Sequence, residues 1–179
     1  MESRPEMALF QGSSAFARFN YGIISSAMNL SVDPAFFELL TGSYERLVGR
    51  SLIPPDKANQ NPVRWLYEAA PFCVLAHNTA RDPVFIYGNK MAQACFEYSW
   101  DELTSLPSSL SAEEGNREER QQLLNQVRQN GFATGYRGLR IAKSGRRFWI
   151  EDVTVWQLVD LQGILHGQAA IYRQWRDAK

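Results

Sequence analysis

One segment near the end of the chain has the composition of a strand but carries large apolar side chains on both of its sides. Between residues 147 and 159 these side chains are Phe148, Trp149, Ile150, Val153, Val155 and Trp156. A strand whose sheet has one face in water shows polar residues at every second position, and this segment does not. The pattern therefore predicts a sheet that is covered on both faces.

Four further strands, and the turns between them, can be placed around this segment. In chain order the predicted strands span residues 72–76, 84–87, 134–142, 147–159 and 164–172. Turn residues follow the first strand, and glycine turns at Ser144-Gly145 and at residues 160–163 join the last three strands. Because tight turns connect antiparallel neighbours, we expect an antiparallel sheet.

Capping residues predict helices before and between these strands. Asp33-Pro34 and Asn61-Pro62 each place a capping side chain ahead of a proline at the first helical position. The first helix ends at Gly49 and has one apolar stripe, which comprises Phe37, Leu40, Tyr44, Leu47 and Val48. Later helix starts are predicted at Asn89 and at the capping boxes Ser99–Glu102 and Asn116–Glu119.

The order of these elements predicts an α+β fold. Helices between the short and the long strands should pack on one face of a five-stranded antiparallel sheet, and the N-terminal helices should cover the other. The chain then divides into a weakly ordered extension, the N-terminal helices and the core, at residues 1–32, 33–70 and 71–175. Met7 and Met28 leave the true start of translation open.

Charge and composition argue against several classes of protein. Lys plus Arg and Asp plus Glu number 19 each, so the chain lacks the cationic excess that nucleic-acid binding needs. No apolar run approaches the ~20 residues that span a bilayer, and we identify no secretory signal. With two cysteines, Cys73 and Cys95, and no metal-ligand spacing, we expect a cytoplasmic protein with reduced thiols and no membrane or nucleic-acid partner.

Several short motifs, in order, resemble those of a known family. They are Ala70-Pro71-Phe72, Asp82-Pro83-Val84-Phe85, Trp100-Asp101-Glu102-Leu103, Leu106-Pro107-Ser108, Ser111-Ala112-Glu113, Glu119-Arg120-Gln121-Gln122-Leu123-Leu124, Ser144-Gly145-Arg146-Arg147-Phe148 and His166-Gly167-Gln168-Ala169-Ala170. Over about residues 34–175 the chain resembles the MEKHLA domain family, which is related to PAS domains. This family occurs as stand-alone proteins in bacteria and algae and as the C-terminal domain of plant class III homeodomain leucine-zipper factors, where it is linked to signal sensing and dimerisation.

The resemblance implies a PAS-like sheet of order 2-1-5-4-3, wrapped around a small cavity. It also implies a sensory or regulatory module for signal sensing and protein interaction, with no DNA-binding region, no catalysis and no known cofactor. A second possibility is a PAS domain that binds flavin, haem or a small aromatic metabolite. A third is a small enzyme that uses His77 or His166, with Asp82 near them, for acid–base chemistry.

If a ligand binds, a set of aromatic and polar side chains is expected to surround it. The candidates are Phe85, Tyr87, Asn89, Cys95, Phe96, Trp100, Phe132, Tyr136, Phe148, Trp156 and Gln168. They either line a pocket, with Asn89 and Gln168 orienting the ligand, or fill the core.

Individual residues bear on the ligand alternatives. Neither cysteine lies in the loop motif of a flavin-adduct photoreceptor, and the helices carry no histidine to ligate haem. Cys95 is either an inert core thiol or a reactive one. The basic group Lys143, Arg146 and Arg147 is either a solvated hairpin tip or an anion site.

The expected partner is a second copy of this chain or a regulatory protein. The stripe of the first helix and the outer side of the strand at residues 147–159 offer a wide apolar area, which predicts a homodimer. The alternative is that the helix folds back onto its own sheet.

Overall fold

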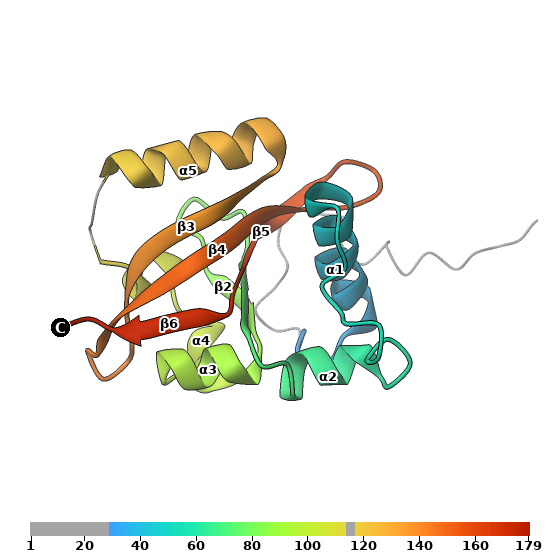
Figure 1. Ribbon diagram of the computed structural model, residues 1–179, viewed down its shortest axis with the longest axis horizontal. Helices are drawn as coiled ribbons and strands as arrows, with labels where there is room; N and C mark the ends of the chain where they lie inside the picture. Colours follow the sequence, from blue (N-terminus) through green and yellow to red (C-terminus); the bar gives the residue numbers. More distant parts are fainter. Residues whose placement is uncertain (1–28, 114–116) are drawn as a thin grey trace, which may run out of the picture.

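The computed structural model describes residues 29–113 and 117–179, and the remaining segments are drawn in grey in Figure 1. Most of the extension predicted at residues 1–32 thus lies outside the described residues, as does Asn116 of one predicted capping box. Leu30, in the described end of that extension, is 2% exposed and belongs to the core.

The described residues form six strands in one antiparallel sheet. They are β1 (Cys73–His77), β2 (Phe85–Gly88), β3 (Phe132–Ile141), β4 (Arg147–Val159), β5 (Leu165–Tyr172) and β6 (Gln174–Asp177). The order is β2-β1-β5-β4-β3, and β6 also pairs with β4. The predicted α+β fold and strand order are confirmed, and the sixth strand is an addition to the five that were predicted.

Strand β6 continues β5 after a break at Arg173. The pairs Thr154–Ile171 and Glu151–Gln174 keep one register against β4 on either side of the break. At the break, the guanidinium of Arg173 lies over the Phe72 ring, 4.4 Å from its centroid. Strand β6 is mostly polar and shows no alternation of apolar and polar residues. For this reason the strand predicted from the sequence ends at Tyr172.

The helices begin and end where local signals place them. They are α1 (Pro34–Val48), α2 (Pro62–Glu68), α3 (Lys90–Phe96), α4 (Trp100–Leu103), the 3₁₀ turn η2 (Ser108–Ser111) and α5 (Arg117–Asn130). The Asp33 carboxylate accepts from the Phe36 N–H at 2.8 Å, and Gly49 ends α1 in the left-handed conformation. The Ser99–Glu102 capping box is formed as predicted.

Helices α1 and α2 cover one face of the sheet, called here the outer face. The Tyr44 ring packs against Trp156 of β4 at 4.9 Å, and the indole N–H of Trp156 donates to Ser43 Oγ at 3.1 Å. Figure 1 shows α1 and α2 together, on a different side of the sheet from α5. The apolar stripe of α1 therefore packs against the sheet of its own chain. Leu40 and Tyr44 are buried there, and Phe37, Leu47 and Val48 are partly buried.

The other face, called here the inner face, packs against α3 and α4. Phe96 of α3 meets Phe148 of β4 edge to face at 5.1 Å, and both side chains are almost fully buried. Alternation in β1 divides its side chains, because Cys73 and Leu75 join the inner cluster and Val74 and Ala76 join the outer one. Among the residues described, no helix is long and apolar enough to cross a bilayer.

Candidate functional site

The candidate pocket residues do not form one group, because the sheet separates them. Phe85, Cys95, Phe96, Tyr136 and Phe148 lie in or against the inner cluster. Tyr87, Trp100, Phe132 and Trp156 lie in or against the outer one. Only the first group is therefore placed to surround a ligand under α3 and α4.

A β-bulge in β4 explains why Phe148 and Trp156 lie on different faces of the sheet. Tyr136 of β3 pairs with Val153, and Gly138 pairs with Ile150, so β4 holds one extra residue at Glu151-Asp152. Asp152 has the positive φ of 49° that such a bulge uses. Because an extra residue turns all later side chains to the other face, Trp156 points outward although it is an even number of positions from Phe148.

Asn89 is buried and fully hydrogen-bonded within the chain. Its Oδ1 accepts from the N–H groups of Val74 and Ala92 at 3.0 and 3.1 Å. Its Nδ2 donates to the carbonyls of Phe72 and Leu66 at 2.8 and 3.3 Å. The predicted helix cap is thus present, and the same amide also joins the end of α2 to the start of β1.

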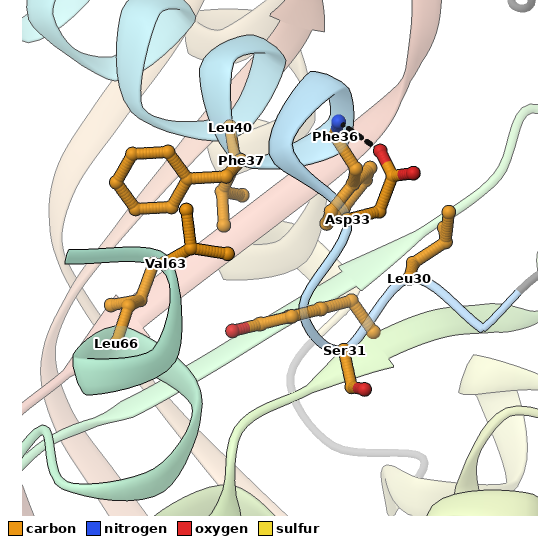
Figure 2. A pocket seen from close by; sticks show the side chains of 9 residues that line it. Leu30, Ser31, Asp33, Phe36, Phe37, Leu40, Val63 and Leu66 are labelled. Carbon is orange, nitrogen blue, oxygen red and sulfur yellow. Dashed lines mark hydrogen bonds between the residues drawn. The ribbon is translucent and has the colours of Figure 1, made fainter. Parts of the chain in front are cut away.

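Tyr87 borders a narrow, partly open hollow on the outer side, whose side chains leave no room for a water molecule (Figure 2). The hollow lies between Leu30-Ser31, the start of α1, and the residues Val63 and Leu66 of α2. Figure 2 shows the Asp33 carboxylate turned to the Phe36 N–H, and the Ser31 hydroxyl donates to Asn29 Oδ1 at 2.6 Å. The Asp33 and Ser31 side chains are thus already hydrogen-bonded within the chain, and most of the other lining side chains are apolar.

The two histidines serve separate local structures. The His77 ring contacts the Asn78 carbonyl through Nδ1 at 2.8 Å, and burial lowers its pKa. His166 Nε2 lies 2.8 Å from Asp160 Oδ2 in the β4–β5 hairpin. Asp82 is exposed on the surface. No group of three or more His, Cys, Asp or Glu side chains in the described part of the chain is arranged to hold a metal ion.

Asp160 organises the β4–β5 hairpin. Burial opposes ionisation of this carboxyl, but hydrogen bonds from His166, Ile164 and Gln162 outweigh burial and lower its pKa. The backbone N–H groups of Gln162 and Ile164 each donate to Asp160 Oδ1 at 2.9 Å. Gln168, the remaining candidate, pairs with His77 across β1 and β5. These contacts account for His166 and Asp160 as residues that hold a turn.

The basic residues of the β3–β4 hairpin all face carboxylates. Lys143 pairs with Glu102 at 2.5 Å, and Arg147 pairs with Glu113 at 2.5 Å. Arg146 pairs with Glu97 at 2.9 Å and with Asp177 at 2.6 Å. Their positive charges are thus balanced within the chain, which disfavours an anion site at this hairpin.

We expect acid to weaken the contact between this hairpin and the helices. Hydrogen bonds from Ser144 and Arg146 lower the pKa of Glu97 to about 2, and those from Lys143 and Ser99 lower that of Glu102 to about 2. A depressed folded-state pKa stabilises the fold above the ordinary value of 4.5, and this contribution is lost as the pH falls towards 2. A Glu97→Gln, Glu102→Gln double variant should therefore melt below wild type at neutral pH.

The measurement is thermal melting followed by circular dichroism over a pH series. The gap between variant and wild type should narrow between pH 4.5 and about 2. Glu38→Gln, at an exposed position of α1, is the matched control and should follow wild type throughout. A gap that stays constant with pH would show that the two carboxylates do not act through their ionised form.

One cluster in the inner layer was not predicted. Cys73 of β1 lies opposite Tyr172 of β5, and the Tyr172 hydroxyl donates to Cys95 Sγ at 3.6 Å. Gln93 was also missed, and its buried amide donates to the Gly88 carbonyl at 2.8 Å. Aligning the predicted strands at residues 72–76 and 164–172 as antiparallel neighbours would have predicted that Tyr172 lies opposite Cys73.

The strand order and the helices on the inner face define a PAS fold. The structure is similar to the PAS domain of a protein from Colwellia psychrerythraea, with a TM-score of 0.51 and 18% identity over 63% of this chain and 90% of that one. It is also similar to an RNA-binding light-oxygen-voltage receptor, with a TM-score of 0.53 and 21% identity over 72% of this chain and 35% of that one. At these identities the likeness extends to the fold alone.

The model of the MEKHLA domain family matches residues 34–177. This chain belongs to that family, as the motifs of its sequence predicted. No curated protein sequence matches it.

Proposed function

We propose that this protein is a sensory or regulatory PAS-type module that responds to a signal by changing its protein contacts, without catalytic turnover. The observation that carries the proposal is the set of contacts made by Arg146. Its Nη2 donates to the Cys95 carbonyl in α3 at 2.6 Å, and its Nη1 pairs with Asp177 of β6 at 2.6 Å. One side chain therefore joins the inner-face helix to the last strand.

Strand β6 is suited to transmit a change because few contacts hold it. It has four residues and pairs with β4 alone. Trp175 is its partly buried anchor, with its ring 5.9 Å from that of Tyr172 in the inner layer. Short elements with few buried contacts open at low cost, so a shift of α3 or Tyr172 is expected to alter the position of β6.

We expect Arg146→Gln to loosen β6 selectively. The variant keeps a polar group but loses the ion pairs with Glu97 and Asp177. Since an exposed ion pair contributes up to about 1 kcal/mol, amide exchange in residues 174–177 should accelerate by up to about fivefold. Hydrogen–deuterium exchange with mass spectrometry measures this.

Arg147→Gln is the control. Arg147 is the neighbouring residue in the same hairpin, and its side chain pairs with Glu113 and not with β6. Exchange in β6 should stay at the wild-type rate in this variant. If the two variants change β6 equally, or neither changes it, then the proposed link between α3 and the last strand is absent.

A small ligand remains the alternative, and purification from the native host separates the two functions. An absorption band of flavin or haem, or an extra mass in native mass spectrometry, would favour a ligand-binding PAS domain. Turnover that is lost in His77→Gln or His166→Gln would favour the enzyme alternative. A colourless protein with its chain mass alone, bound to a protein partner, is the result that the regulatory role leads us to expect.

The homodimer stays a prediction. The stripe of α1 that motivated it packs on the outer face of its own sheet. A second copy, or a regulatory protein, would therefore use other surfaces.

A further inference from the structure

Two thiols and a phenol meet in the inner layer, on three different elements. Cys73 begins β1, Cys95 lies in α3 and Tyr172 ends β5. The three side chains belong to one buried cluster, in which Cys73 lies opposite Tyr172 across β1 and β5 and the Tyr172 hydroxyl donates to Cys95 Sγ at 3.6 Å. All three side chains are at least 95% buried, and both cysteines are free.

The surroundings distinguish the two thiols. Interaction with the Cys73 thiol lowers the pKa of Cys95, and Tyr172 and the charge of Arg146 act in the same direction against burial. The pKa of Cys73 is raised, first by the neighbouring Cys95 thiol and then by burial. Cys95 is therefore the thiol that ionises first, with Cys73 as a protonated neighbour.

A single buried thiol in an apolar core is usually an inert small side chain. A pair differs, because a nucleophilic thiolate beside a second thiol is the arrangement that forms a disulfide after oxidation. Arg146 adds the cation that such a thiolate needs, since its guanidinium lies against the Cys95 carbonyl and over the Phe148 ring.

We propose that Cys95 and Cys73 form a reversible disulfide when the protein meets a hydroperoxide, which makes the inner layer the input of the sensory function proposed above. The Cys95 thiolate attacks one peroxide oxygen, the O–O bond breaks, and the products are a Cys95 sulfenic acid and, with hydrogen peroxide, hydroxide. The Cys73 sulfur then attacks the sulfenic sulfur and releases its hydroxyl group as water, with the proton supplied by the Cys73 thiol. The peroxide is reduced, and two thiols become one disulfide.

Disulfide formation has a structural route to β6. The new bond draws Cys95 Sγ towards β1, so the buried Tyr172 hydroxyl loses its acceptor at 3.6 Å. Tyr172 meets Trp175, the anchor of β6, edge to face, and Arg146 holds both the Cys95 carbonyl and Asp177. The oxidised protein is therefore expected to release the last strand, and a thiol reductant should restore it.

The test uses the intact chain, reduced and then exposed to hydrogen peroxide. Intact mass spectrometry should show the loss of two hydrogen atoms, and peptide mapping without reductant should find Cys73 joined to Cys95. A thiol reductant should reverse both results. Thiols that stay reduced in the folded protein, oxidation that stops at sulfinic acid, or a disulfide between chains would each overturn the proposal.

Tyr172→Phe tests the geometry without removing either thiol. Loss of the hydroxyl removes one of the donors that stabilise the Cys95 thiolate, so disulfide formation should slow several-fold. Tyr44→Phe is the matched control, since its hydroxyl accepts from Arg50 on the outer side, and its rate should equal that of wild type. An unchanged rate in Tyr172→Phe would contradict the assigned role of the phenol.

This result is separable from the sensory function. The covalent bond is detected by mass, whether or not β6 responds. Conversely, the link through Arg146 is tested in the reduced protein with no oxidant. Disulfide formation with no change in β6 exchange would keep the redox pair and reject the route to the last strand.

Discussion

Replacing Asn89 with alanine should lower the free energy of unfolding by about 3–6 kcal/mol. The amide accepts from Val74 and Ala92 and donates to Leu66 and Phe72, and the residue is completely buried. Each buried backbone group that loses its partner costs about 1–3 kcal/mol. Since domains of this size are stable by about 5–15 kcal/mol, much of the stability of the fold depends on this amide. Urea denaturation followed by tryptophan fluorescence measures the change.

Asn125→Ala provides the control for this prediction. Asn125 is exposed on α5, where its Oδ1 accepts only from Gln121 Nε2. Surface replacements of this kind change stability by about 0.5 kcal/mol or less. If Asn89→Ala costs no more than Asn125→Ala, the four hydrogen bonds of Asn89 are replaced by solvent, and its role as a structural clamp is refuted.

Local signals predicted the elements well because they act within a few residues. The Asp33 and Asn61 caps, the proline that follows each of them, and the left-handed Gly49 decide helix ends through contacts inside one turn. The bounds of β4 were likewise predicted from the apolar side chains on its two sides. Both sides are buried as predicted, one in the outer cluster and one in the inner cluster.

The faces of the side chains were harder to predict because they depend on bulges. Counting alternate residues along β4 places Phe148 and Trp156 on one face, and the extra residue near Asp152 places them on opposite faces. Asn89 illustrates a second limit. A buried amide must find partners, but the sequence does not reveal whether they belong to a ligand or to the backbone of Leu66 and Phe72.

The redox pair was out of reach of sequence patterns for a similar reason. Cys95 was predicted to be either an inert core thiol or a reactive one, but its neighbours Cys73 and Tyr172 come together through the register of β1 against β5. Register between strands far apart in the chain is decided by the packing of the whole sheet. The choice between an inert and a reactive thiol therefore depends on tertiary contacts.

Gly167→Ala should destabilise the protein by about 3 kcal/mol or more, since over-packing against backbone atoms is not easily relieved. A Cβ at Gly167 would lie 2.0 Å from the His77 carbonyl oxygen and 3.1 Å from its carbonyl carbon. These atoms belong to the end of β1, where His77 pairs with Gln168. The two strands would have to separate there, so amide exchange near His77 should also accelerate. Urea denaturation and hydrogen exchange measure the two effects.

Gly42→Ala is the matched replacement, and its effect should have the opposite sign. Gly42 lies inside α1, where a Cβ would meet only Arg46 Nη1 at 3.1 Å, the end of a flexible side chain. Alanine is favoured over glycine in a helix interior by about 0.8–1.0 kcal/mol, so this variant should be slightly more stable than wild type. The same methyl group thus stabilises α1 and disrupts the β1–β5 pair, because at Gly167 the space is already filled by main chain. A Gly167→Ala protein as stable as Gly42→Ala would mean that β1 and β5 approach less closely than the structure shows.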